Sequence, residues 1–299
     1  RNSDNCMDWL TVDILTKWKL KEIDIKGSTI TAQFFILISE LTYIKLNSYN
    51  INDDIVIYIA QNSPHLERLQ FLSDNITEES IIALSKMCLF LKELDIHFIP
   101  KFSTPGFAYY CSHALSCIRH LGTDQIDRNK QDATILIPYM TGITSLDLGY
   151  SFYSNVQLLI QYCQKLTRIY VYGDNYHVTD ILSLFCANPL LEEIACYYPC
   201  KLTDTALIEL IHACPHLHTL YLPYVTTITD IGILALSEHC TQLQQLVCQE
   251  CKEITEATAV QLVQRCRKLT DFRVHRNSLS EETRKELKKT RSHLLVQIN

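Results

Sequence analysis

The stretch from Cys240 to Cys266, CTQLQQLVCQECKEITEATAVQLVQRC, contains the signals that decide the fold of this chain. Near its start, three apolar residues with variable residues between them predict a short strand with one buried face: Leu243, Leu246 and Cys248. Ile254-Thr255-Glu256 follows, where Thr is a favoured helix N-cap and an acid in the first turn suits the helix dipole. An amphipathic helix should then run to Cys266. The stretch therefore predicts one strand followed by one helix.

The same unit recurs through nearly the whole chain, in steps of 21 to 28 residues. Its first apolar residue stands at Leu20, Leu41, Leu66, Leu91, Leu115, Ile143, Leu166, Leu191, Leu217, Leu243, Leu269 and Leu294. A fixed period of this size indicates a solenoid, and one strand plus one helix per unit indicates leucine-rich repeats. We predict an α/β leucine-rich-repeat solenoid over residues 20–299: a horseshoe of eleven or twelve turns, with a parallel sheet on its concave face and helices on its convex face.

The repeat makes specific predictions about individual residues. One apolar strand residue per turn should lie in the core, and we name six: Leu94, Leu146, Ile169, Ile194, Leu220 and Leu246. Five threonines should cap helices: Thr77, Thr179, Thr203, Thr229 and Thr255. The fifth unit departs from the pattern, because Cys117 and His120 stand beside Ile118 where apolar strand residues belong.

The bulk composition narrows the possible partners. The 299 residues are 47% apolar, enough for a large core, and the formal net charge is −6. A negative chain has no general attraction to nucleic acid or to anionic lipid. The longest apolar runs, such as residues 34–38, are too short to span a bilayer. We therefore expect neither a nucleic acid nor a membrane as partner.

The 13 cysteines are spread along the chain, most of them at one phase of the repeat. This distribution predicts reduced, buried, structural thiols and a cytoplasmic or nuclear protein, since secreted repeat proteins concentrate disulfides in their end caps. Cys248-x-x-Cys251 could offer half a metal site, but both residues stand at core phases of the repeat. With no phosphate-binding loop or catalytic triad pattern either, we expect no metal, no cofactor and no enzymatic activity.

The pattern Cys-x-x-Leu-x-x-Leu-x-Leu-x-x-Cys-x-x-Ile-Thr-Asp, matched nearly throughout residues 240–266, resembles the cysteine-containing subclass of leucine-rich repeats. The resemblance covers residues 20–299. That subclass occurs largely in F-box/leucine-rich-repeat proteins, the substrate receptors of cullin–RING (SCF-type) ubiquitin ligases. The resemblance implies a protein or peptide substrate on the concave face, with a Skp-type adaptor and a cullin as further partners if a full F-box lies upstream.

Residues 1–19 have two interpretations. Cys6, Trp9 and Trp18 resemble the tail of an F-box that runs into the first strand, although the adaptor-gripping front of an F-box is absent from the sequence. Alternatively, these residues form a cap that shields the apolar end of the first turn. The function has an alternative as well: a stand-alone leucine-rich-repeat scaffold that binds a partner without any link to a ligase.

The outward strand positions, which are the third, fifth and seventh of each unit, change character along the chain. They are mainly charged and polar at first, whereas six later ones are candidates for partner binding: Arg119, Arg168, Tyr170, Tyr172, Tyr197 and Tyr221. Tyr and Arg are enriched at interface hot spots, so these residues predict a site for an acidic or aromatic protein or peptide. The alternative is a cross-strand aromatic ladder, which would stabilise neighbouring turns by about 0.2–1 kcal/mol per pair.

Overall fold

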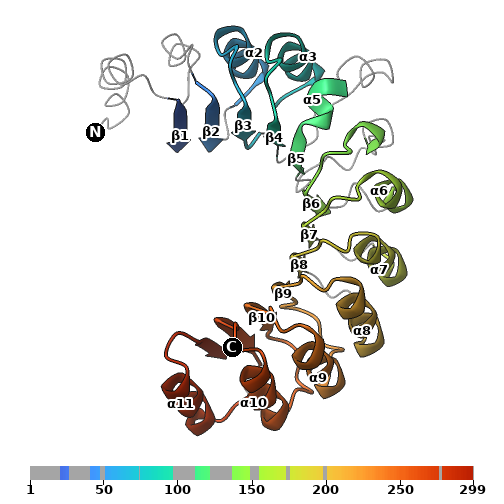
Figure 1. Ribbon diagram of the computed structural model, residues 1–299, viewed down its shortest axis with the longest axis vertical. Helices are drawn as coiled ribbons and strands as arrows, with labels where there is room; N and C mark the ends of the chain where they lie inside the picture. The colour runs from blue at the N-terminus through green and yellow to red at the C-terminus, as the bar shows by residue number, and fades with distance from the viewer. Residues whose placement is uncertain are drawn as a thin grey trace. The chain divides into compact units, whose positions relative to one another are not determined.

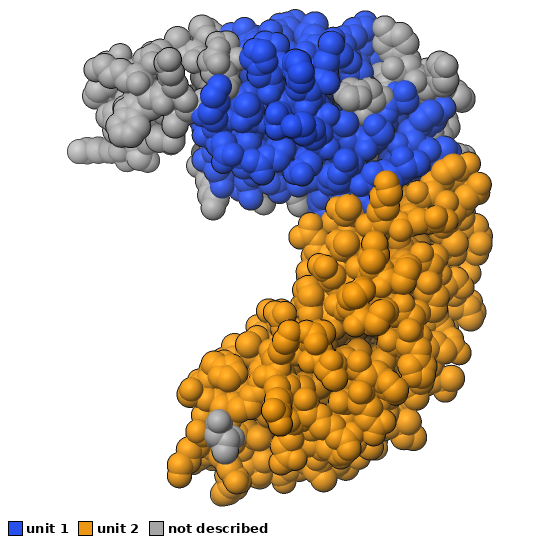
Figure 2. Space-filling view, in the orientation of Figure 1, with its two compact units in different colours: residues 1–143 blue, residues 144–299 orange. Residues whose placement is uncertain are grey.

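The computed structural model describes residues 21–26, 41–47, 51–73, 75–96, 112–121, 137–148, 155–172, 176–197, 201–275 and 278–298. The chain divides into two compact units, residues 1–143 (unit 1) and residues 144–299 (unit 2), shown in Figure 2. Residues 1–19, predicted as a cap or as the remnant of an F-box, lie outside the described residues.

Both units are built from strands and helices that alternate along the chain (Figure 1). The described elements of unit 1 are β1 (Glu22–Lys26), β2 (Tyr43–Asn47), α2 (Asp53–Asn62), β3 (Arg68–Phe71), α3 (Glu78–Met87), β4 (Glu93–Ile96), α5 (Ser112–Ser116), β5 (Ile118–Leu121) and the 3-10 helix η3 (Ile137–Tyr139). Those of unit 2 are β6 (Ser145–Leu148), α6 (Val156–Tyr162), β7 (Arg168–Val171), α7 (Val178–Cys186), β8 (Glu193–Cys196), α8 (Asp204–Ala213), β9 (Thr219–Tyr221), α9 (Asp230–His239), β10 (Gln245–Cys248), α10 (Glu256–Arg265), β11 (Asp271–Val274), α11 (Glu281–Thr290) and β12 (Leu295–Ile298). Among the described residues, no helix is long and apolar enough to cross a membrane.

The strands are parallel and follow one another in sequence order, from β1 to β5 in unit 1 and from β6 to β12 in unit 2. Each predicted repeat start is followed by a strand one to three residues later. The α/β solenoid predicted from the repeat is confirmed. In each unit the helices cover one face of the sheet, and we call the other face the open face.

The core lies between the strands and the helices. The six predicted core residues, Leu94, Leu146, Ile169, Ile194, Leu220 and Leu246, all have an exposed fraction of 0%. Within unit 2, pairing sets Ile169 opposite Ile194, Ile194 opposite Leu220 and Leu220 opposite Leu246. Each apolar row therefore continues from turn to turn, and this continuity confirms the predicted register.

The cysteines belong to this core. All ten cysteines in the described residues are free thiols, and nine of them are buried, with Cys186 exposed. Burial raises the pKa of Cys88, Cys163, Cys214 and Cys240 to about 12, so these thiols are protonated at physiological pH. Several of them donate hydrogen bonds to carbonyls one turn earlier, such as Cys214 Sγ to Phe185 O at 3.7 Å. These thiols pack in the core and connect neighbouring turns through their hydrogen bonds.

Carboxylates link the start of one helix to the start of the next. The Asp204 side chain accepts from Thr229 N at 3.0 Å and from Thr229 Oγ1 at 2.7 Å, and Asp230 accepts from Thr255 N and Oγ1, both at 2.8 Å. Asp204 also accepts from Gly232 N, where an added Cβ would lie 2.5 Å from Asp204 Oδ1. The acid after Thr203 and the acid after Thr229 therefore also satisfy the cap of the following turn.

Four of the five predicted threonine caps are confirmed, and Thr179 is wrong. Thr77, Thr203, Thr229 and Thr255 are N-caps whose side chains accept from the helix backbone. Helix α7 instead begins at Val178 with His177 as N-cap, and Thr179 Oγ1 bonds His177 Nδ1 at 2.6 Å. The first turn of the preceding helix, α6, contains no acid, so no carboxylate there can hold Thr179 as a cap.

We expect Glu256 to stabilise the fold above the ordinary pKa of a glutamate carboxyl and to lose this contribution as the pH falls. Its pKa is lowered by hydrogen bonds from the Ser280 and Thr283 side chains and from the Ser280 backbone, with Ser280 Oγ 2.6 Å from Glu256 Oε1. A lowered folded-state pKa gives stability that is present above the unfolded-state pKa and lost as pH falls through the folded-state pKa. An NMR titration of the carboxyl carbon should give a higher pKa in Ser280→Ala than in the wild type. Equal values would contradict the link.

Candidate functional site

The open face of unit 2 brings one outward position of each turn into a row, the fifth position in every turn except the last. Strand pairing aligns Asp147, Tyr170, Ala195, Tyr221, Val247, Arg273 and Gln297 from β6 to β12. Neighbouring strands are about 4.8 Å apart, so the side chains of this row form a continuous surface across the sheet. The middle of the row is apolar and aromatic, and its charged members stand toward the ends.

Three of the predicted tyrosines form a ladder across adjacent turns. Backbone hydrogen bonds fix Tyr172 and Tyr197 at the ends of β7 and β8: Tyr172 N donates to Leu148 O at 2.8 Å, and Tyr197 N donates to Val171 O at 2.9 Å. The rings of Tyr172 and Tyr197 are stacked, with centroids 4.5 Å apart and planes at 3°. Tyr221 lies 5.2 Å from Tyr197, tilted by 44°. We call Tyr172, Tyr197 and Tyr221 the tyrosine ladder.

The ladder is relevant to both interpretations of the tyrosines, partner binding and stabilisation of neighbouring turns. Cross-strand contact, which the stabilising interpretation requires, is confirmed. All three rings are also only half-buried on the open face, as is Tyr170 beside them. A surface that is stacked in advance and still partly exposed suits a partner, because little side-chain entropy remains to be lost on binding. Partner binding by these residues stays a prediction.

Acidic groups set the electrostatics around the tyrosines. The pKa of Tyr170 is raised by burial, by the charge of Glu193 and by a hydrogen bond to Glu193, while Arg168 acts in the opposite direction. Burial also raises the pKa of Tyr197, with Tyr221, Glu193 and Asp147 adding to the shift and a hydrogen bond from Tyr172 opposing it. The phenols of Tyr170 and Tyr197 therefore stay neutral at physiological pH and present hydroxyl groups rather than charge.

Two small apolar residues lie beneath this surface, and neither was predicted to be part of the site. Ala195 and Val247 stand at outward positions of β8 and β10, yet they are 1% and 2% exposed. Large neighbours cover them, since Ala195 lies between Tyr170 and Tyr221 in the row and Val247 lies between Tyr221 and Arg273. The available signal was the loss of alternation in EIAC and QLVC, where three apolar residues follow one polar residue.

The six predicted site residues do not all come together. Arg168, Tyr170, Tyr172, Tyr197 and Tyr221 share the open face of unit 2, with Arg168 exposed at the third position of its repeat, the first residue of β7. Arg119 belongs to unit 1, where its expected strand position is corrected by one residue. A register shift in β5 sets His120, not Arg119, opposite Asp95. Arg119 Nη1 instead donates to Ser116 O at 2.9 Å and packs against Gly142.

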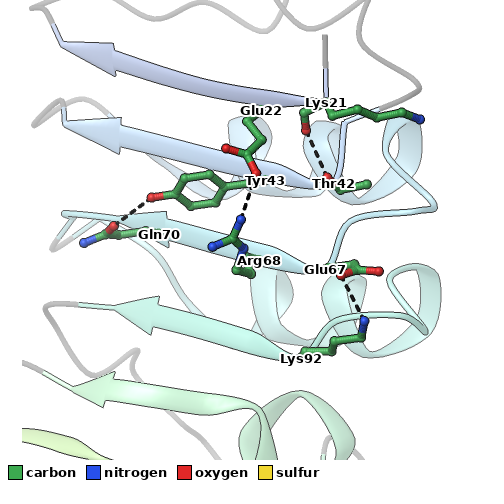
Figure 3. Close-up of polar contacts among 8 residues, drawn as sticks. All are labelled: Lys21, Glu22, Thr42, Tyr43, Glu67, Arg68, Gln70 and Lys92. Carbon is green, nitrogen blue, oxygen red and sulfur yellow. Dashed lines mark hydrogen bonds and ion pairs between the residues drawn. The ribbon is translucent and has the colours of Figure 1, made fainter. Parts of the chain in front are cut away.

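The open face of unit 1 has a different character (Figure 3). Arg68 pairs with Glu22 at 2.9 Å and lies over the Tyr43 ring, 4.5 Å from its centroid. Tyr43 Oη donates to Gln70 Oε1 at 3.4 Å. The charged and polar side chains here pair with one another, as on a solvated sheet. Of the two open faces, that of unit 2 is the better candidate for a binding site.

Among the described residues, no group of three or more His, Cys, Asp or Glu side chains is placed to hold a metal ion. Cys248 and Cys251 are both 0% exposed, at the core phases predicted for them. Cys251 Sγ lies 3.0 Å from Val225 O.

Comparisons with known proteins give structural neighbours only. No protein-family model matches the chain, and no curated protein sequence matches it. The chain is similar to a chain of the crystal structure of the yeast Rad7–Elc1 complex, with a TM-score of 0.67 and 16% identity over 97% of this chain and 83% of that one. A leucine-rich-repeat protein of Leptospira interrogans is more distant, with a TM-score of 0.42 and 11% identity over 91% of this chain and 82% of that one.

At 16% identity, the likeness to the Rad7–Elc1 structure concerns the fold alone. The same strand–helix unit and the same buried apolar phases recur through both units of this chain. The fold is a leucine-rich-repeat solenoid.

Proposed function

We propose that this leucine-rich-repeat solenoid is a protein-interaction module without catalytic activity of its own, which binds a protein or peptide on the open face of unit 2. The observation that carries the proposal is the half-exposed aromatic surface made by the tyrosine ladder and Tyr170, which lies over the buried Ala195 and Val247. Arg168 stands at its edge. A solvated sheet has no need of such residues at its outward positions, whereas tyrosines beside an arginine are the composition of an interface hot spot.

The chemistry of the surface favours apolar and aromatic partner side chains. The phenols of Tyr170 and Tyr197 are neutral, and Glu193 and Asp147 lie near them. Of the two arginines expected to attract an acidic partner, Arg119 packs against its own unit. We therefore propose a partner segment rich in apolar and aromatic residues, held by ring contacts and by hydrogen bonds to the phenol hydroxyls.

We further propose that the module is the substrate-recognition part of an F-box/leucine-rich-repeat subunit of a cullin–RING ubiquitin ligase. Support comes from the cysteine-containing repeat of residues 240–266 and from the F-box-like pattern of Cys6, Trp9 and Trp18. The likeness to a structure in which Rad7 is in complex with Elc1 fits a solenoid that assembles with a second protein. In this proposal residues 1–19 are the end of an F-box.

The ligase proposal predicts a specific co-purification result. The natural full-length protein, purified from its own cells, should bring a Skp-type adaptor and a cullin with it. Residues 20–299, expressed in the same cells, should not, because the expected adaptor-binding segment precedes them. Quantitative mass spectrometry of both preparations checks this. If the full-length protein recovers no adaptor, the stand-alone scaffold replaces the ligase proposal, and the binding surface of unit 2 is unaffected.

A further inference from the structure

A groove of about 440 Å³ lies between α10 and α11, away from the open face. One stripe of α10 and the residues that follow it line one wall: Val260, Val263, Gln264 and Arg267. Thr283, Glu286 and Leu287 from α11, with Arg291 just after it, line the other wall. The spacing of three and four residues places each set on one side of its helix. The volume falls in the range of small-molecule sites, about 300–1,000 Å³.

The sequence of α11 explains why the groove exists. Helix α9 packs closely on α10, whereas α11 makes few contacts with α10. The segment EETRKELKKT contains a single large apolar residue, Leu287, so α11 has little with which to fill the space beside its neighbour. Val260 on α10 is consequently left half-exposed along a groove, with the buried side chains of Val263 and Leu287 at its floor.

Arg291 holds this last turn in place. It stands three residues before Leu294, the phase that cysteine occupies at Cys214, Cys240 and Cys266. Its guanidinium Nη1 donates to Val263 O at 2.8 Å and to Cys266 O at 3.0 Å. Its Nη2 donates to two more carbonyls at 2.6 Å, those of Arg267 and Leu269. These bonds satisfy the carbonyl of Val263 in the last turn of α10 and three carbonyls just beyond the helix, which would otherwise repel an anion.

Charge is distributed unevenly along the groove. Arg267 is exposed at the end where Arg291 covers the carbonyls, and its side chain forms no ion pair with the part of the chain that the structure describes. Glu286, the acid of the lining, precedes Arg291 by five residues, about 7.5 Å along a helix axis. The groove therefore combines an apolar floor, a positive end and an acid farther along.

We propose that the groove between α10 and α11 binds a small molecule with an apolar body and an anionic head group. The body lies along Val260, Val263 and Leu287. The head group lies at Arg267, where a charge-assisted hydrogen bond is available and the carbonyls of α10 are already occupied. This site is independent of the open face and of any link to a ligase.

Two fluorescent probes with the same apolar body test the proposal on the full chain. Anilinonaphthalene sulfonate carries an anionic group, and phenylnaphthylamine is its uncharged analogue. The wild type should bind the sulfonate about ten-fold more tightly than the amine, and Arg267→Gln should remove that preference. Lys268→Gln is the matched control, because it removes a neighbouring exposed charge that does not line the groove. It should keep the preference.

A filled groove tests the location. Gln264 is exposed on α10, so Gln264→Trp should fold normally, which circular dichroism verifies, and should weaken binding of both probes by at least ten-fold. In the wild type, the methyl signals of Val260, Val263 and Leu287 should shift on titration with the sulfonate. Unchanged binding in Gln264→Trp, equal losses in Arg267→Gln and Lys268→Gln, or shifts confined to other methyl groups would each overturn the site.

Discussion

Replacing Leu220 by Ala should lower the free energy of unfolding by about 2–5 kcal/mol, the range for large-to-small changes in a packed core. Leu220 is 0% exposed in β9, between Ile194 of β8 and Leu246 of β10, which are equally buried. The change removes apolar contacts and leaves a cavity that neighbouring turns can fill only by shifting along the whole row. Urea unfolding followed by circular dichroism measures the loss.

Ile231→Ala is the matched control for Leu220→Ala. It also shortens a large aliphatic residue in unit 2, but Ile231 is 62% exposed in the first turn of α9. Its effect should stay within about 0.5 kcal/mol, as for most surface substitutions. If the two variants lost equal stability, or if Leu220→Ala lost less than about 1 kcal/mol, the register of the apolar rows would be in error.

The fold could be predicted because its determinants are local and repeated. A residue such as Cys251 can be assigned to the core from its phase alone, since Val225 one turn earlier occupies the same place. Every turn carries a copy of the same sequence pattern. A turn whose copy is weak can therefore be aligned from the turns on either side of it. The position of a residue could be predicted where its surroundings are set by its own turn and by an adjacent turn with the same pattern.

Predictions failed where the neighbouring turn breaks the pattern. Thr179 has the sequence of a cap, but the preceding helix has no acid to hold it. Arg119 follows Ile118 in a strand that accommodates one extra residue. This extra residue shifts the alternation of inward and outward side chains by one position for the residues that follow it. The available signal was Leu121, an apolar residue one place later than the repeat requires.

The candidate site was predictable in composition but not in contacts. Repeat phase alone sets the tyrosines on the outward face. Which rings touch depends on the residues around them. Tyr197 contacts Tyr221 although they occupy the seventh and the fifth position of their repeats. The residue directly opposite Tyr221 is the small Ala195 rather than a large residue. A sequence pattern that treats turns as equivalent carries no information about such diagonal packing.

Replacing Tyr197 by Ala should weaken binding of the protein partner by about 2 kcal/mol, roughly 30-fold in Kd. Tyr197 is the middle ring of the ladder, stacked on Tyr172 and in contact with Tyr221, so its removal takes away its own contacts and the support of both neighbours. The same variant should lose about 0.2–1 kcal/mol of stability for each of the two lost pairs. Titration calorimetry and urea unfolding give the two quantities.

Two further variants separate binding from folding. Tyr197→Phe keeps both ring contacts and removes the hydroxyl that accepts from Tyr172, so it should retain most of the stability and most of the affinity. Tyr224→Ala removes a tyrosine that is 55% exposed just beyond β9, outside the ladder, and should change neither quantity by more than about 0.5 kcal/mol. A Tyr197→Ala protein that is destabilised yet binds its partner normally would mean that the ladder serves the fold alone. The partner would then have to bind elsewhere, because Tyr172 and Tyr221 both contact the Tyr197 ring that this change removes.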